Sequence, residues 1–187
     1  SNFRMETLVK DLEKNAKSAV ESLKTELAGV RTNRPNPKLV EDIKVDYLGQ
    51  ILTIKQLGSI SIIPPREIDI SVWDKAAINS VAKAVETSGR GLTANVDGNL
   101  IRINLPTLTD ERRQELIKLA KSLTEQSKIR IRSLRDEANK KIEAAFKAKT
   151  LSEDQKFKTK EQVQKAVDKV NAEIESLLAG KIKEINE

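Results

Sequence analysis

The chain has 187 residues, with 34 Lys and Arg against 28 Asp and Glu, and it contains neither Cys nor His. The missing thiol and imidazole exclude a disulfide framework, a zinc ribbon, a thiolate nucleophile and a Ser-His-Asp triad, although carboxylate-only Mg or Ca sites stay open. Aromatic residues make up 3% of the chain, so the core must be aliphatic. No apolar run approaches the ~20 residues that a membrane helix needs, and we expect no membrane association.

The first residues contain no apolar stretch of the kind that signal peptides have. A start at Met5 would make residues 1–4 a cloning remnant. The lack of Cys fits a reducing cytoplasm.

Most of the net charge of +6 falls in one segment. Residues 107–149 contain twelve basic and seven acidic residues, whereas the rest of the chain is nearly balanced. A local basic excess favours a polyanionic partner, most often nucleic acid. A Lys-rich helix face that serves only solubility explains the excess equally well.

The first segment predicts a long helix. From Met5 to Val30 the apolar residues recur at steps of three and four, which is the spacing of one helix face. The segment Arg31–Pro37 then contains two prolines and two asparagines. These residues end the helix and predict a short, stiff connection.

Between Leu39 and Leu105 the apolar period changes to two. Alternation predicts half-buried strands at residues 43–47, 60–62 and 68–72. Residues 74–86 predict a helix with Asp74 as its N-cap, and Asp97-Gly98 predicts a hairpin turn.

Two further helices follow Pro106. Thr109 is a good N-cap, and an apolar stripe then runs to Ala145. The last helix begins at Ser152, where Gln155 completes a capping box. Its stripe reaches Leu177 and then shifts register to Ile182 and Ile185.

Each long helix has one narrow apolar stripe, which it must bury against the others. The predicted fold is therefore α+β with two domains. An antiparallel three-helix bundle, residues 1–30 and 107–187, contains an inserted small strand-rich α/β domain, residues 31–106. The two connections, residues 31–37 and 104–107, predict a hinge. Its expected residues are Arg34, Pro35, Pro37, Leu105 and Pro106.

Catalytic groupings are missing from the sequence. Gly89-Arg90-Gly91 is the one close glycine pair, and it fits neither the P-loop nor the dinucleotide fingerprint. The carboxylates alternate with basic residues on helix faces, and Ser and Thr lack an activating base. We expect neither an enzyme nor a cofactor.

The second long helix offers a binding face instead. Steps of four, three and four place four residues on one side, away from the apolar stripe: Lys128, Arg132, Arg135 and Asn139. Lys121 and Thr124 extend this face backwards. The guanidinium group of Arg can make bidentate contacts to a phosphate, and Asn can add hydrogen bonds to the nucleic-acid backbone or to base edges. Without interleaved aromatics, recognition of a folded RNA by shape and phosphate fits better than base stacking on a single strand.

The alternative for this face is a solvated surface on which the basic residues pair within the helix. The candidate partners are Glu125, Asp136 and Glu137.

The order helix, α/β insert, helix, helix resembles the ribosome recycling factor family, and four stretches support the resemblance. Val30-Arg-Thr-Asn-Arg-Pro-Asn-Pro37 is similar to the family's Arg-Thr-Gly-Arg-Ala-Ser/Asn-Pro signature. Asn99 to Arg113 is similar to its Ile-Arg…Pro-x-Leu-Thr-Glu-Glu-Arg-Arg junction. Ile131 to Lys140 is similar to its Val-Arg-x-x-Arg-Arg-Asp-Ala-Asn stretch, and Leu151-Ser-Glu-Asp154 to the loop before its last helix.

The resemblance implies a non-enzymatic, cofactor-free translation factor. Such a factor binds the post-termination 70S ribosome and, with elongation factor G and GTP, separates the subunits and frees messenger RNA and tRNA. The helical domain is then expected against large-subunit ribosomal RNA. The RNA-facing residues carried over are Arg31, Arg113, Arg132, Arg135 and Asn139. We expect a monomer in the bacterial cytoplasm.

Three departures from the family pattern matter. Asn33 replaces Gly, and because Asn tolerates left-handed backbone angles the turn is expected to survive. Pro35 replaces Ala and should stiffen the hinge. Asp136-Glu137 replaces Arg-Asp and removes a positive charge beside Arg135.

Two other functions compete with this interpretation. A coiled-coil scaffold or chaperone would explain the heptads, but neither the basic helix nor the strand-rich insert. A stand-alone RNA-binding protein would explain the basic helix. Sedimentation with empty ribosomes, and competition by elongation factor G, would separate all three.

Overall fold

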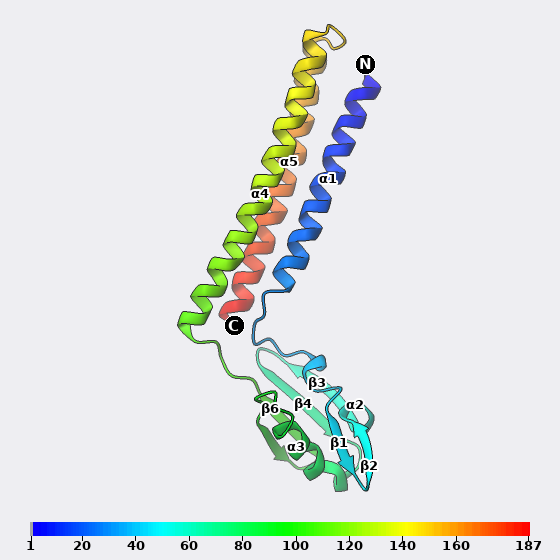
Figure 1. Ribbon diagram of the computed structural model, residues 1–187, viewed down its shortest axis with the longest axis vertical. Helices are drawn as coiled ribbons and strands as arrows, with labels where there is room; N and C mark the ends of the chain where they lie inside the picture. The colour runs from blue at the N-terminus through cyan, green and yellow to red at the C-terminus, as the bar shows by residue number, and fades with distance from the viewer. Residues whose placement is uncertain (1) are drawn as a thin grey trace. The chain divides into compact units, whose positions relative to one another are not determined.

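The computed structural model describes residues 2–187, which divide into two compact units. The first unit contains the residues up to Arg31 together with Asp110–Asn186, and the second contains Thr32–Thr109 and Glu187. Figure 1 labels the elements of both units. The first unit is a helix bundle and the second is the strand-rich insert.

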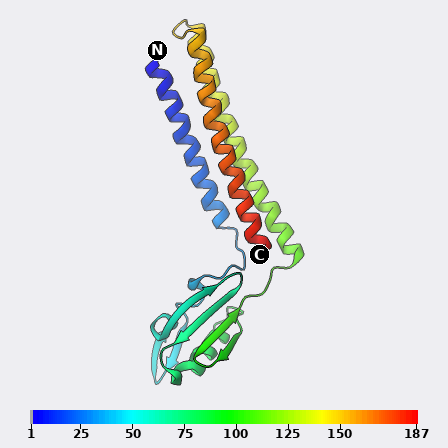
Figure 2. The ribbon, with the colours of Figure 1, turned by 180° about the vertical axis from the view of Figure 1, so that it is seen from behind.

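The bundle consists of α1 (Asn2–Ala28), α4 (Asp110–Lys147) and α5 (Glu153–Asn186). The three helices lie side by side in both views (Figures 1 and 2). α4 and α5 are antiparallel because only a short loop joins them, and α1 runs antiparallel to α4. The α+β fold expected from the sequence, a bundle with a strand-rich insert, is confirmed.

The apolar stripe predicted on α1 forms one wall of the bundle core. Its buried members on α1 are Met5, Leu12, Ala16, Ala19, Leu23 and Leu27, and Val20, which the stripe did not include, is buried as well. Ile131 and Ile142 from α4, and Val163 and Ile174 from α5, belong to the same cluster.

Among residues 2–187, none of the helices combines the length and the apolar content needed to cross a membrane.

The loop between α4 and α5 is closed by the predicted capping box. The Ser152 N–H donates to Gln155 Oε1 at 2.9 Å, and the Gln155 N–H donates to Ser152 Oγ at 3.2 Å. Lys149 adopts a left-handed backbone with φ 59°, which reverses the chain after α4. Two exposed backbone donors at the start of α5 are thus satisfied by side chains.

The register shift predicted near the end of α5 is wrong. The position seven residues after Ile174 is Lys181, and it is buried, with 7% of its surface exposed. Its ammonium group lies 3.2 Å from the Glu184 carboxylate. The aliphatic stem of lysine packs like an apolar side chain while the paired charge is satisfied, so the stripe continues unbroken to Ile185.

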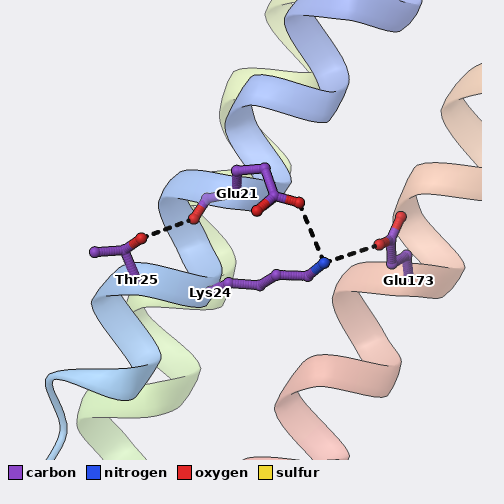
Figure 3. A network of polar contacts seen from close by, with 4 residues as sticks. All are labelled: Glu21, Lys24, Thr25 and Glu173. Carbon is purple, nitrogen blue, oxygen red and sulfur yellow. Dashed lines mark hydrogen bonds and ion pairs between the residues drawn. The ribbon is translucent and has the colours of Figure 1, made fainter.

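A polar network also joins α1 to α5 at the bundle surface (Figure 3). Lys24 lies 3.2 Å from Glu21 on its own helix and 3.8 Å from Glu173 on α5. The Thr25 hydroxyl donates to the Glu21 carbonyl at 3.1 Å. These charged groups are exposed, so the network contributes little to the stability of the bundle.

The insert contains a four-stranded antiparallel sheet in the order β3-β4-β6-β5. Its strands are β3 (Gly58–Ile63), β4 (Glu67–Val72), β5 (Ala94–Asp97) and β6 (Leu100–Asn104). The remaining elements are the hairpin β1 (Lys44–Tyr47) and β2 (Gln50–Thr53), the helices α2 (Ile54–Leu57) and α3 (Ile78–Glu86), and the 3-10 turns η1 (Pro37–Leu39) and η2 (Lys75–Ala77).

The insert has its own aliphatic core on one face of this sheet. Strand residues such as Ile68, Ile70 and Ile101 are fully buried there, together with Val81 and Val85 of α3. The strands predicted by alternation are confirmed, as is the turn before β6, where Gly98 has φ 64°. Neither β2 nor α2 was predicted.

Asp74 begins the helical segment as expected. Its carboxylate accepts a hydrogen bond from the Ala76 N–H at 3.0 Å, but the first turn is the 3-10 turn η2 and the α-helix starts only at Ile78. The Tyr47 hydroxyl also donates to Asp74, and these two bonds lower the pKa of the Asp74 carboxyl below its ordinary value. The hairpin is thereby joined to the start of α3.

We expect Gly58→Ala to destabilise the insert by about 1–3 kcal/mol, as overpacking typically does. A Cβ at this position would lie 2.4 Å from the Ser71 carbonyl oxygen on the paired strand, and backbone atoms give way at high cost. Hydrogen exchange of the β3 and β4 amides measures the change. Gly49→Ala would be a poor control because its φ is positive, so Gly180→Ala, with open space around it, serves instead. Equal protection in both variants would contradict the close approach at Gly58.

Candidate nucleic-acid interface

The four residues predicted to share a face lie on α4 beside its buried stripe. Lys128, Arg132, Arg135 and Asn139 span about 16 Å of helix at ~1.5 Å per residue. Ile131, Ala138 and Ile142 are buried, which fixes the rotation of α4. Arg132 is therefore exposed, and the other three are half-buried.

Arg132 is the most available cation of this group. It has no hydrogen bond or ion pair within the part of the chain that the structure describes. Arg135, in contrast, lies against Asp136, with 3.2 Å between its Nη2 and Asp136 Oδ1 and 3.3 Å from its Nε. The expectation that Asp136 weakens the field at Arg135 therefore has a structural basis.

Lys128 has a partner that sequence reasoning missed. Its ammonium group donates to Glu175 of α5, and 30% of the Lys128 side chain is exposed. The partners considered from the sequence were all on the same helix. Of these, Glu137 lies 3.8 Å from Lys141. A pair between helices depends on their relative register, and a helical wheel of α4 contains no signal for it.

Asn139 and Thr124 are less exposed than the predicted polar face of α4 requires. The Asn139 Oδ1 atom is buried and lacks a hydrogen-bond partner among residues 2–187. Thr124, expected to extend the face, is buried, and its hydroxyl donates to the Ala120 carbonyl at 2.8 Å. Thr124 therefore belongs to the core, because the back-bonded hydroxyl is satisfied inside the helix.

Arg113 and Arg31 lie away from this group. Arg113 is near the start of α4, about 22 Å along the helix axis from Lys128, and it pairs with Asp110. Arg31 is exposed in the connection after α1 and makes no hydrogen bond or ion pair with the other described residues. The structure brings together only the four α4 positions.

The expected hinge residues occupy different environments. Pro35 is buried and Arg34 is exposed, whereas Pro37 begins η1. Leu105 belongs to the core of the insert, and the Pro106 carbonyl accepts a hydrogen bond from Asn33 at 2.6 Å. Asn33 does not have a positive φ, so the left-handed turn expected there is absent.

Comparison with known proteins identifies the family. Residues 23–185 match the ribosome recycling factor family. This chain belongs to the ribosome recycling factor family. The identification made from sequence motifs is confirmed, and the family is one of non-enzymatic translation factors.

Relatives in this family match the chain over nearly its full length. The ribosome-recycling factor of Aquifex aeolicus is 44% identical over 97% of this chain and 96% of the relative. The ribosome-recycling factor of Clostridioides difficile is 42% identical over 95% of this chain and 96% of the relative.

Solved structures of ribosome recycling factors are also similar. One solution structure is 44% identical, with a TM-score of 0.60 over 97% of this chain and 96% of the other. A second is the T. thermophilus ribosome recycling factor, described together with E. coli elongation factor G bound to the E. coli post-termination complex. It is 31% identical, with a TM-score of 0.57 over 97% and 98% of the two chains.

In this ribosome recycling factor family member, a second charged cluster joins α4 to α5. Lys160 donates to Glu143 at 2.6 Å, and Lys156 lies 3.1 Å from the same carboxylate and over the Phe146 ring. The Lys160 hydrogen bond, and then that of Lys156, hold the pKa of the Glu143 carboxyl below its ordinary value of 4.5.

Within residues 2–187, His, Cys, Asp and Glu side chains form no group of three or more that could hold a metal ion.

We expect Glu143→Gln to lower the melting temperature of the bundle at neutral pH. A lowered folded-state pKa means that the carboxylate stabilises the fold above pH 4.5, and that this contribution disappears as the pH falls through the folded-state value. Thermal melts of both proteins from pH 7 to pH 3 should therefore converge in acid. Glu137→Gln, which alters a more exposed pair within one helix, is the control and should change less. A difference that persists unchanged in acid would exclude the charge as its cause.

Proposed function

We propose that this protein binds the post-termination ribosome and, with elongation factor G and GTP, separates its subunits so that messenger RNA and the remaining tRNA are released. The observation that supports this most is the similarity to ribosome recycling factors over almost the whole length of both chains. Both the bundle and the insert are covered, so the similarity is not confined to one unit. The sequence contains no P-loop, and GTP hydrolysis is assigned to elongation factor G.

The proposed RNA contact is the α4 surface around Arg132. Large-subunit ribosomal RNA presents phosphates at high density, and a guanidinium fork can donate two parallel hydrogen bonds to one of them. Arg132 is exposed and makes no hydrogen bond or ion pair with the described residues, so binding a phosphate breaks no existing pair. Arg135 and Lys128 must first loosen their pairs with Asp136 and Glu175. We rank Arg132 first among the candidate contacts, ahead of these two and of Asn139, Arg113 and Arg31.

The insert is proposed to move as one body relative to the bundle during recycling. Each unit has a separate aliphatic core. The chain passes from one unit to the other near residues 31–37 and 104–107, and Glu187, directly after α5, is grouped with the insert. A body with its own core transmits force without unfolding, so an elongation factor that pushes on the insert would bend the connections instead.

Ribosome sedimentation tests the proposed function. The purified protein should pellet with vacant 70S ribosomes and with isolated large subunits. Addition of elongation factor G and GTP should release it in step with subunit separation. A protein that pellets equally well with unrelated structured RNA would instead be a general RNA-binding protein. A protein that stays in the supernatant in every mixture would contradict the proposal.

We also expect a monomer that needs no cofactor, in the bacterial cytoplasm where ribosomes are recycled. The apolar stripes of α1, α4 and α5 are buried against one another within the chain, which supports a monomer. Light scattering at micromolar concentration should give the mass of one chain, 20.9 kDa. EDTA should leave the melting curve unchanged. A stable dimer would contradict this expectation.

A further inference from the structure

Two ion pairs fix which residues of α4 and α5 lie opposite each other. The Lys128 ammonium group donates to Glu175, and Lys160 donates to Glu143 at 2.6 Å. The two pairs are 15 residues apart on both helices, from 128 to 143 on α4 and from 160 to 175 on α5. The helices therefore keep one antiparallel register between the two pairs, over about 22 Å at ~1.5 Å per residue.

This register places Asn171 of α5 across from Arg132 of α4. Arg132 follows Lys128 by four positions, and Asn171 precedes Glu175 by four positions, so the two residues are level with each other about 6 Å from that ion pair. A step of four keeps a residue on the same side of its helix. Both side chains therefore lie beside the α4–α5 seam, the line along which the two helices pack, on the side where Lys128 meets Glu175.

The side-chain amide of Asn171 has its oxygen turned into the seam. Asn171 Oδ1 is buried and lacks a hydrogen-bond partner among residues 2–187. The residue as a whole is half-buried, and Nδ2, which also has no partner among these residues, is not buried. A buried acceptor without a donor destabilises a fold. Packing of the seam thus gives no reason for an amide at this position, and the part of it that solvent can reach is a hydrogen-bond donor.

The acids one helical turn from Arg132 or Asn171 are already occupied. Each of them accepts a hydrogen bond from another side chain: Asp136 from Arg135, Asp168 from Gln164 and Glu175 from Lys128. Arg132 is exposed and has no partner within the described residues. Two donors from two helices, a guanidinium and an amide, therefore stand at one level without an acceptor.

We propose that Asn171 and Arg132 hold one phosphate of structured RNA together, so that the RNA interface crosses the seam from α4 onto α5. This inference rests on the proposed RNA contact of α4 and adds a residue of α5 to it. A backbone phosphate has non-bridging oxygens that accept only, which matches a site that only donates. Asn, like Arg, commonly donates to nucleic-acid phosphates. Arg132 supplies the charge, and Asn171 Nδ2 donates to the same phosphate from the other helix.

Binding to isolated large ribosomal subunits, measured by sedimentation over a range of KCl concentrations, tests this proposal. Asn171→Ala should weaken binding about tenfold, which corresponds to one hydrogen bond to a charged group. The salt slope should stay that of the parent, because no charge is removed. Gln162→Ala is the matched control, since Gln162 is an exposed amide of α5 that points about 180° away from Asn171. It should bind within about twofold of the parent.

Asn171→Asp separates a donated hydrogen bond from mere polarity. It keeps the shape of the side chain but replaces the donor by a carboxylate, which can pair with Arg132. Binding should therefore be weaker than for Asn171→Ala, and the salt slope should become shallower by roughly 0.7–0.9, as if the Arg132 contact itself were lost. An Asp variant that binds like the parent would overturn the proposal.

A double-mutant cycle decides whether the two residues hold the same phosphate. In an Arg132→Ala background, Asn171→Ala should cost less than about threefold, because residues that share a ligand are not additive. The same tenfold loss in both backgrounds would overturn the shared contact, as would parent affinity in Asn171→Ala alone. If the parent itself does not bind large subunits, the proposed function falls as well, whereas a parent that binds with additive losses contradicts only this inference.

The melting temperature adds a readout that a purely structural role would not give. Asn171→Ala removes a buried oxygen that has no donor, so the variant should melt at or above the temperature of the parent while it binds RNA less well. A variant that melts lower and loses affinity in proportion would assign Asn171 to the packing of the seam and overturn the proposal.

Discussion

Replacing Arg132 and Arg135 together by Glu is expected to weaken ribosome binding by at least tenfold at moderate salt. Each arginine is proposed to hold a phosphate, and charge-assisted hydrogen bonds are the strong ones. The slope of log affinity against log salt should become shallower by roughly 0.7–0.9 per lost contact. Filter binding or sedimentation over a range of KCl concentrations measures both quantities.

Single substitutions give the matched control for this prediction. Arg130→Glu and Arg132→Glu change the net charge equally and lie two positions apart, but α4 points them about 160° apart around its axis. Both arginines are exposed. Arg132→Glu should alter the salt slope strongly, whereas Arg130→Glu should not. Arg135→Glu should alter it less than Arg132→Glu does, because Asp136 already lies 3.2 Å from the Arg135 guanidinium. Equal losses for Arg130 and Arg132 would indicate a diffuse charge effect rather than a contact.

Two further observations keep the binding result interpretable. Exposed charge substitutions usually change stability by about 0.5 kcal/mol or less, so helicity and melting temperature should stay close to those of the parent. Arg132→Lys should restore binding only in part, because lysine keeps the charge and loses the planar fork. A double Glu variant with the affinity and salt slope of the parent would show that this face of α4 is merely solvated.

Leu23→Ala should destabilise the bundle by about 2–5 kcal/mol. Leu23 is 1% exposed on α1 and belongs to the core cluster to which Ile131 and Ile174 contribute from α4 and α5. Its truncation leaves a cavity that three long helices cannot close without shifting along their whole length. Urea unfolding followed by circular dichroism at 222 nm measures the loss, because the long helices dominate that signal.

Leu119→Ala provides the control for the core prediction. Leu119 lies on α4 with 46% of its surface exposed, and its truncation should cost about 0.5 kcal/mol or less. The insert should keep its stability in both variants, which hydrogen exchange of the β4 and β6 amides reports. Similar losses at Leu23 and Leu119 would contradict the described bundle core.

The long helices were predictable because each must bury a single stripe. From Met5 to Val30 the spacing of apolar residues requires one helix face, and Ser152 with Gln155 marks the start of α5 through a local capping box. The buried strands of the insert were predictable for a similar reason, since alternation follows directly from having one covered face. In each case the signal lies within a few consecutive residues.

Features that depend on packing were not predictable in this way. β2 is exposed or half-buried along its length, so it shows no alternation. Lys181 occupies a core position because its stem packs and Glu184 takes its charge, although lysine is ordinarily read as exposed. The partners of Lys128 and Asn33 lie 47 and 73 residues away, and only the folded chain brings them together.

The central claim, that this protein recycles ribosomes, is tested most directly by light scattering of post-termination 70S complexes in a stopped-flow instrument. Mixing with the purified protein, elongation factor G and GTP should give a rapid fall in scattering as the subunits separate. Omission of the protein, of elongation factor G or of GTP should abolish that fall. Scattering that falls no faster with the protein present than with elongation factor G and GTP alone would contradict the account.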